Sequence, residues 1–240
     1  MVTGHSFMDC YIISIATNSG TVIVLSAKYM KTKRILIADD HSAIRSGVKH
    51  ILTNEFSNME FGYATNAGEV FQIVHAHAWD LIILDINLPG RNGFDILKQL
   101  KDEESKIPVL VFSFHCEEQI AIRALRSGAF GYLAKDAADT ELVKAINTIL
   151  SGKKYISPLV SEQLLSQLEN PFNKSPHELL SDREFQTLLF IASGKTVTEI
   201  AEKLSLSHPT ISTYRARILQ KMGMKNNAEI TNYAIRQNLV

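Results

Sequence analysis

Cysteine is scarce in this chain of 240 residues, which contains only Cys10 and Cys116. Two cysteines cannot form the disulfide framework of a small secreted domain, and neither lies at metal-ligand spacing from a histidine or another cysteine. We therefore expect a reducing, cytoplasmic setting.

Long apolar runs are also missing. The longest uncharged stretch near the N-terminus, residues 10–27, is interrupted by Asn18, Ser19 and Gly20. It is shorter than the about 20 apolar residues that a bilayer span needs. A signal peptide starts with basic residues, whereas the only early charge is Asp9. We expect no membrane segment and no membrane partner.

Two interpretations of the N-terminal region remain. The runs YIISIA and TVIVL around the turn Asn18-Ser19-Gly20 are typical of a β-hairpin. Alternatively, residues 1–30 are an N-terminal extension, disordered or arising from an upstream start codon, because Met30 stands directly before a complete domain. The second interpretation predicts that a chain beginning at Met30 folds and functions fully.

Formal net charge is zero, but the two signs are unevenly distributed. Residues 33–150 contain 12 Lys and Arg against 16 Asp and Glu, net −4, and residues 181–240 contain 8 against 5, net +3. An acidic first part and a basic last part indicate two domains with different partners.

The first domain, expected over residues 31–152, alternates apolar runs with amphipathic stretches. The runs are apolar throughout, as in strands whose two faces are both buried. Five strands that are each followed by a helix predict a doubly wound α/β fold with a five-stranded parallel sheet. The predicted strands are 34–38, 59–64, 81–85, 108–113 and 129–134, and the predicted helices are 41–52, 67–77, 93–101, 117–127 and 140–150.

A linker is expected over residues 153–176, with a short helix near 160–168, because glycine, proline and asparagine recur there. Residues 177–240 then show no strand pattern. Their helical stretches predict a second, all-α domain of four helices, at 182–193, 196–204, 208–222 and 227–237.

Polar side chains follow four of the five predicted strands. Asp39 and Asp40 follow the first, Asp85 ends the third, Ser113 ends the fourth and Lys135 follows the fifth. Any one of these acids alone is more often a helix-capping loop residue. Together they meet at one edge of a parallel sheet, where clustered carboxylates need a proton or a cation. All-oxygen ligands favour Mg²⁺, and a free carboxylate beside Mg²⁺ and lysine suits phosphoryl transfer.

These residues lie in segments that resemble the CheY-like receiver domain of two-component response regulators. The resemblance covers about residues 33–150 and rests on ILIADDH at 35–41, LIILDINLPGRNG at 81–93, VLVFS at 109–113 and GAFGYLAKD at 128–136. It implies that Asp85 accepts a phosphoryl group from a sensor histidine kinase. It also implies Mg²⁺ bound by Asp39, Asp40, Asp85 and the backbone carbonyl of Asn87, with Ser113, Tyr132 and Lys135 as phosphoryl-contact and switch residues.

The second domain contains a helix, 208–222, with a cationic and small polar face. Ser207 is a good N-cap and Pro209 fits the first turn. No acid occurs between residues 208 and 222. Such a helix after a short turn suits the DNA major groove, although a solvated basic face alone would be weak support.

The stretch 180–226 resembles the LuxR/NarL-type helix-turn-helix, and STYRARILQKM is similar to virulence-type regulators of that family. The resemblance places Ser212, Thr213 and Ala216 at base-contacting positions. Relatives often have Lys where this chain has Ser212, which leaves the recognised sequence open. Phosphate contacts are expected from Lys195, Arg215, Arg217 and Lys221, and Thr210 is also expected at the DNA surface.

The whole pattern predicts a transcription regulator that binds promoter DNA and forms a homodimer when phosphorylated or bound to DNA. Dimerisation is expected through the receiver's fourth helix, fifth strand and fifth helix. An aspartate-based phosphatase is a rival, but such enzymes place a general acid close to the nucleophile, where this chain has Asn87. A protein-interaction module is a second rival. We expect a regulator rather than an enzyme.

Overall fold

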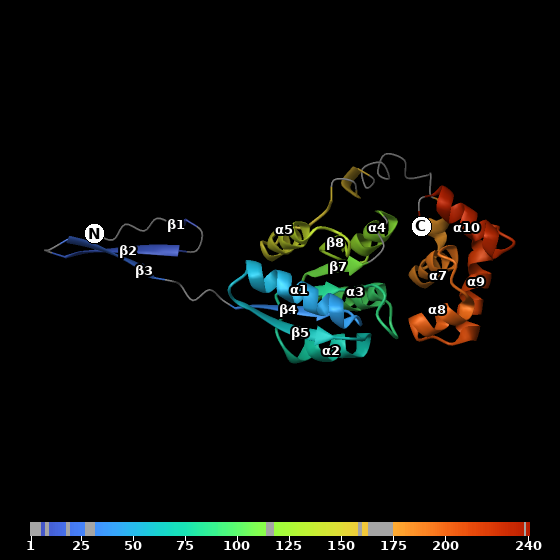
Figure 1. Cartoon of the computed structure of the whole chain (residues 1–240), viewed down its shortest axis with the longest axis horizontal. Helices are drawn as coiled ribbons and strands as arrows, with labels where there is room; N and C mark the ends of the chain where they lie inside the picture. Colours follow the sequence, from blue (N-terminus) through green and yellow to red (C-terminus); the bar gives the residue numbers. More distant parts are fainter. Residues whose placement is uncertain are drawn as a thin grey trace.

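The computed structural model describes residues 6–7, 10–17, 20–26, 32–113, 118–157, 160–162, 175–237 and 239–240. Two folded domains follow a separate N-terminal sheet (Figure 1). Within the described ranges, no helix is both long and apolar enough to span a bilayer.

The first domain is a five-stranded parallel sheet in the order β5-β4-β6-β7-β8. Its strands are β4 (Lys33–Ala38), β5 (Met59–Ala64), β6 (Leu81–Leu84), β7 (Val109–Ser113) and β8 (Gly131–Ala134). Its helices are α1 (Ser42–Glu55), α2 (Ala67–Ala76), α3 (Gly93–Asp102), α4 (Glu118–Arg126) and α5 (Asp139–Leu150). The predicted doubly wound α/β fold is confirmed.

Burial follows the position of each strand in the sheet. β6 and β7 are buried at every residue, as expected for strands covered on both faces. β5 lies at the edge of the sheet, and only Ala64 of its six residues is buried. The expectation that every strand is fully buried is therefore wrong for β5 and for the other edge strand, β8, in which only Gly131 and Leu133 are buried, because an edge strand has a neighbour on one side only.

The second domain is helical, as predicted. It comprises the short 3-10 helix η1 (Pro176–Leu179), α7 (Asp182–Ala192), α8 (Val197–Leu204), α9 (His208–Met222) and α10 (Asn227–Arg236). The helix ends follow from local sequence, since Ser181, Thr196, Ser207 and Asn226 each cap a helix by accepting a backbone N–H bond. Gly223 ends α9 in the left-handed conformation, with φ 65°.

The connection between the domains begins later than expected. Tyr155 is 7% exposed and packs in the receiver core, and it forms an isolated parallel bridge with Gly131 of β8. The packed unit therefore extends past the predicted boundary at 152, to Tyr155 and to the buried Val160, which packs with Ala121 and Ile122 of α4. Most of the short helix expected near 160–168 lies outside the described residues.

An antiparallel sheet lies within the first 30 residues. It contains β1 (Ser6–Phe7), β2 (Cys10–Thr17) and β3 (Gly20–Ser26), in the order β1-β2-β3. This agrees with the β-hairpin interpretation of YIISIA and TVIVL. The expectation that the working protein begins at Met30 stays a prediction.

Candidate functional site

The strand ends bring the five predicted site residues to one edge of the receiver sheet. Asp39 and Asp40 follow β4, Asp85 follows β6, Ser113 ends β7 and Lys135 follows β8. Parallel register aligns these ends, because Ala38 pairs with Leu84, Leu84 with Val111, and Ser113 with Ala134.

Lys135 joins the two buried carboxylates. Its Nζ lies 2.5 Å from Asp39 Oδ2 and 2.7 Å from Asp85 Oδ2. The lysine side chain is 0% exposed, and Asp39 and Asp85 are 2% and 1% exposed. Burial raises the pKa of the Asp85 carboxyl, with the Lys135 ammonium opposing the rise and Asp39 adding to it. The site therefore holds buried negative charge, and a bound cation would reduce the free-energy cost of burying that charge.

Glycine is required in the loop that carries Asp85. A Cβ added at Gly93 would lie 2.7 Å from Ile86 Cα and 2.9 Å from the Asp85 carbonyl oxygen. The Gly93 N–H also donates to the Ile86 carbonyl at 3.0 Å. Because the colliding atoms are backbone, no side-chain rotation could relieve the contact, so α3 can start this close to Asp85 only with glycine.

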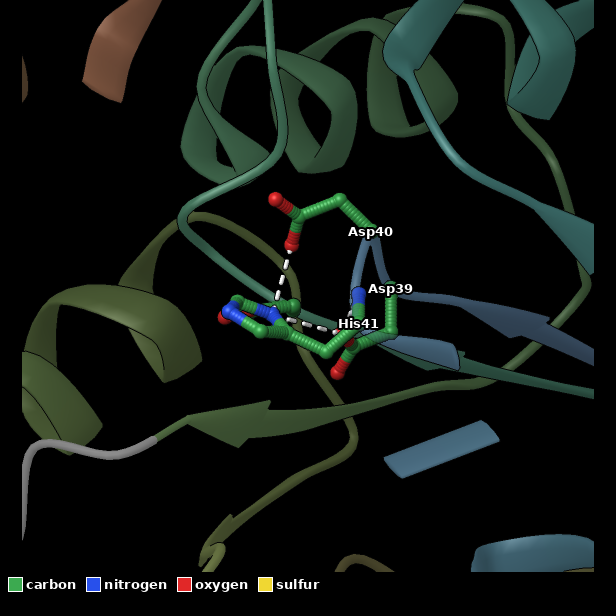
Figure 2. Close-up of side chains that lie close together, drawn as sticks. Asp39, Asp40 and His41 are labelled. Atoms are coloured by element: carbon green, nitrogen blue, oxygen red, sulfur yellow. Dashed lines mark hydrogen bonds and ion pairs between the residues drawn. The ribbon is translucent and has the colours of Figure 1, made fainter. Parts of the chain in front are cut away.

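His41 is a neighbour that the sequence analysis missed. Its Nδ1 lies 2.8 Å from Asp40 Oδ1 and 3.2 Å from Asp39 Oδ1, between the two carboxylates (Figure 2). Its backbone N–H donates to the same Asp39 oxygen at 2.8 Å. The sequence signal was its position directly after the acid pair.

The donor set fits a hard divalent cation. Asp39, Asp40, His41 and Asp85 each offer a ligand atom, and these atoms lie within 4.8 Å of one another. Three of the four are carboxylates, the ligand type that Mg²⁺ prefers.

Ser113 is a second feature, after the cation donor set, that indicates a ligand-binding site. It is 0% exposed, and within the described part of the chain its Oγ has no hydrogen-bond partner. A buried hydroxyl without a partner costs about 1–3 kcal/mol, which a bound oxygen acceptor would recover. Tyr132 lies on β8 half-buried, packed against Ile122 and Val160.

The second candidate surface is the outer face of α9. Ile211 and Ile218 of this helix are buried, whereas Thr213, Ala216 and Arg217 are exposed. Among the other predicted DNA-contacting residues, Lys195 and Lys221 are exposed, and Thr210, Ser212 and Arg215 are half-buried.

Two of the predicted phosphate-contacting cations already have protein partners. Lys221 Nζ lies 2.6 Å from Glu184 Oε2, and Arg215 Nε donates to Asn227 Oδ1 at 2.6 Å. Both bonds link α9 to a neighbouring helix, so these two side chains also hold the bundle together.

Comparison with known proteins agrees with both halves of this description. Residues 35–147 match the family model of the response regulator receiver domain, and residues 178–234 match that of the bacterial regulatory proteins of the luxR family. The response regulator UvrY of Escherichia coli O157:H7 is 33% identical over 206 residues, which cover 85% of this chain and 94% of UvrY. The chain belongs to the LuxR family of response regulators. This family consists of DNA-binding transcription regulators of two-component systems, not of enzymes.

Other relatives resemble the regulator over most of its length. The response regulator GacA of Pseudomonas viridiflava is 33% identical over 208 residues, covering 86% of the regulator and 97% of GacA. A structure of RcsB from Salmonella enterica serovar Typhimurium, bound to the promoter rprA with the phosphomimetic BeF3⁻, has a TM-score of 0.60. It is 25% identical and covers 85% of the regulator and 98% of RcsB.

Proposed function

We propose that the regulator is switched by phosphorylation of Asp85 and that α9 then binds promoter DNA. The observation that carries this proposal is the buried ammonium of Lys135, which lies 2.7 Å from Asp85 and 2.5 Å from Asp39. A fully buried lysine between two buried acids is costly for the fold alone. At a phosphorylation site, the same ammonium offsets the charge of the incoming group.

In the proposed reaction, an Asp85 carboxylate oxygen attacks the phosphorus of a phosphohistidine in a sensor kinase. A carboxyl O–P bond forms, the N–P bond breaks and the electron pair returns to the histidine nitrogen. Lys135 pairs with the acyl phosphate, and Ser113 Oγ, which has no partner among the described residues, donates to a phosphoryl oxygen. Tyr132 is the proposed aromatic that responds when Ser113 moves.

Mg²⁺ is the proposed cofactor. It would be held by the carboxylates of Asp39, Asp40 and Asp85 and by the backbone carbonyl of Asn87. When bound, it supplies positive charge that offsets the phosphoryl oxygens in the transition state. His41 Nδ1, which lies between Asp39 and Asp40, is a further donor at the same place.

On DNA, we propose base contacts from Ser212, Thr213 and Ala216 with a further contact from Thr210. The proposed phosphate contacts come from Lys195, Arg215, Arg217 and Lys221. Promoter binding as a homodimer is supported by the RcsB structure on promoter DNA and by a structure of two RcsB dimers bound to two parallel DNAs. The proposed dimer surface is α4, β8 and α5, and a cytoplasmic location follows from chromosomal DNA as the partner.

The test is phosphoryl incorporation from acetyl phosphate into the full chain. We expect incorporation that requires Mg²⁺ and is lost in Asp85→Ala but retained in Asp136→Ala, because Asp136 is exposed beside the same site. Gel shifts with genomic fragments, with and without acetyl phosphate, then test the link to DNA. Incorporation that persists in Asp85→Ala would refute the proposed acceptor. If no fragment is retarded at any salt concentration, α9 would instead belong to a protein-interaction module.

A further inference from the structure

The first helix of the DNA-binding domain, α7, packs against the loop that follows the phosphorylation site. Gln186 of α7 is 4% exposed, and its Nε2 donates to Asn87 Oδ1 at 2.7 Å. Arg183, one turn earlier, donates to the Gly90 carbonyl at 2.7 Å. Two side chains of one domain therefore bind the loop of the other at two points.

The orientation of the Gln186 amide is set by a helix cap. Asn92 caps α3, and its Oδ1 accepts the Phe94 N–H at 3.1 Å, which directs its Nδ2 to Gln186 Oε1 at 3.1 Å. Arg183 Nη1 donates to the same Gln186 oxygen at 3.3 Å. With its oxygen facing two donors, Gln186 presents only N–H groups to Asn87.

Asn87 in turn touches the proposed phosphoacceptor. Its backbone N–H donates to Asp85 Oδ1 at 3.1 Å, while Lys135 Nζ binds Asp85 Oδ2 at 2.7 Å. Both carboxylate oxygens of Asp85 therefore have a donor while α7 is docked. Asn87 is held at its backbone by Asp85 and at its side chain by Gln186.

We propose that Gln186 is a positioning residue that restrains phosphoryl transfer to Asp85, acting from the DNA-binding domain through Asn87. The inference rests on the proposed phosphorylation of Asp85. By fixing the Asn87 side chain, Gln186 holds the Asn87 N–H on Asp85 Oδ1 and so lowers the nucleophilicity of that oxygen. Docking of α7 therefore disfavours phosphorylation, and by thermodynamic reciprocity phosphorylation disfavours docking of α7.

Other contacts of the domain interface lie away from this loop. Asp182 pairs with Lys98 of α3 at 2.5 Å and with Arg123 of α4 at 3.3 Å. These contacts hold the domains together without reaching Asp85, so the interface has one part that docks and another, centred on Gln186, that contacts the reacting loop.

The experiment compares full-length Gln186→Met with wild type. Methionine keeps the length of the side chain and removes its hydrogen bonds to Asn87, Asn92 and Arg183. With acetyl phosphate and Mg²⁺, we expect faster phosphoryl incorporation and tighter BeF3⁻ binding, each by about two- to tenfold, the factor that one hydrogen bond supplies. Without metal or phosphodonor, we expect the Asn87 amide to exchange hydrogen for deuterium faster by a similar factor.

The matched control is Gln99→Met. Gln99 is a half-buried glutamine of α3 whose side chain bonds to Arg91 and Glu103 within the receiver domain. The same chemical change there should leave incorporation and Asn87 exchange at the wild-type level. An equal effect of both variants would mean that the substitution acts through receiver stability, and this would refute a positioning role for Gln186.

A double-mutant cycle tests the route through Asn87. Once Asn87→Ala has removed the acceptor, adding Gln186→Met should change the phosphorylation rate little further. Additive effects, or wild-type behaviour of Gln186→Met in all three readouts, would overturn the inference while leaving Asp85 phosphorylation intact. If the wild-type chain incorporates no phosphoryl group, the proposed function is refuted, and this inference is refuted with it.

Discussion

Individual cations of the DNA-binding domain differ in what surrounds them. Arg217 lies exposed on the outer face of α9, whereas Lys221, four residues later, pairs with the 2%-exposed Glu184 of α7. Burial raises the pKa of the Glu184 carboxyl, but the interaction with Lys221 helps to lower it below its ordinary value. The two cations are both candidate phosphate contacts, but only Lys221 neutralises a buried acid.

Arg217→Ala should therefore weaken DNA binding without weakening the fold. We expect reduced affinity for all sequences and a salt dependence whose slope falls by about 0.9 units, the value for one lost phosphate contact. Thermal unfolding should be unchanged. The measurement is a gel-shift or anisotropy titration over a range of salt concentrations. An unaltered slope would show that Arg217 makes no phosphate contact.

Lys221→Ala is the contrasting case. Removing the lysine leaves the buried Glu184 carboxylate without its ammonium partner, so we expect the free energy of unfolding to fall by about 1–3 kcal/mol. Denaturant unfolding measures this loss. Lys225→Ala is the control, because Lys225 is an exposed lysine just past the end of the same helix. Equal stability of the two variants would contradict a structural role for Lys221.

His177 predicts a pH dependence of the DNA-binding domain. This residue of η1 is 2% exposed, its Nδ1 lies 2.7 Å from the Tyr233 hydroxyl, and burial lowers its pKa to about 4. Because the histidine of the unfolded state takes up its proton at a higher pH than that of the folded state, the free energy of unfolding should be highest above pH about 6.5. It should fall as the pH drops toward 4. We expect a loss on the order of 3 kcal/mol over that range.

Unfolding of wild type and His177→Gln between pH 4 and 7 tests this expectation. Glutamine offers hydrogen-bonding groups but does not titrate, so its stability curve should be flatter. Parallel curves for the two proteins would assign the pH dependence to other groups.

At the scale of elements, the start of α3 is the tightest junction near the site. Gly93→Ala would push a methyl group against the backbone of Asp85 and Ile86. We expect a loss of stability of about 1–3 kcal/mol and slower phosphorylation, because the loop that carries Asp85 must shift.

Gly47→Ala is the control for Gly93→Ala. Gly47 lies exposed in α1, where an added Cβ meets no atom within 4 Å. Alanine there should stabilise the helix by about 0.5–1 kcal/mol. Denaturant unfolding of both variants measures the difference, and a neutral Gly93→Ala would mean that the loop adapts without cost.

Most helices and strands, and the site residues at the strand ends, were predictable from the sequence. Apolar runs and helical periodicity gave all ten receiver elements, and the strand ends gave Asp39, Asp85 and Lys135 as neighbours, because parallel strands align their carboxyl ends. Local pattern could not give the exposure of β5 or the packing of Tyr155 on β8. Both depend on which strand lies at a sheet edge, and that is a property of tertiary topology.

At the scale of the whole molecule, the two domains are joined by a half-buried arginine. Arg123 of α4 donates to the carbonyls of His177 at 2.6 Å and Leu180 at 3.0 Å, and its guanidinium lies 4.2 Å from the ring centre of Phe185. No sequence pattern marked this residue, or Gln186, as functional, because their partners in the other domain are 54 or more residues away in the chain.

Arg123→Met should loosen the docking of the domains while each remains folded. Its carbonyl partners in η1 would lose charge-assisted hydrogen bonds, so we expect faster hydrogen exchange in residues 177–182 and a larger radius of gyration by small-angle scattering. Arg126→Met is the control, since that side chain is 58% exposed and lies 4.0 Å from Glu178. If Arg123→Met stays as compact and protected as Arg126→Met, Arg123 does not hold the domains together.

The contact between α7 and the loop after Asp85 has a consequence for chimeric regulators. α7 contacts the receiver, whereas Figure 1 shows α9 on the far side of α7. Grafting a foreign output domain that lacks glutamine at this position onto this receiver would change the residue facing Asn87 even if promoter recognition were transferred intact. If Gln186 restrains phosphorylation as proposed, such a hybrid would incorporate phosphate from acetyl phosphate at an altered rate, and restoring glutamine at that one position of the graft should return the rate of the parent.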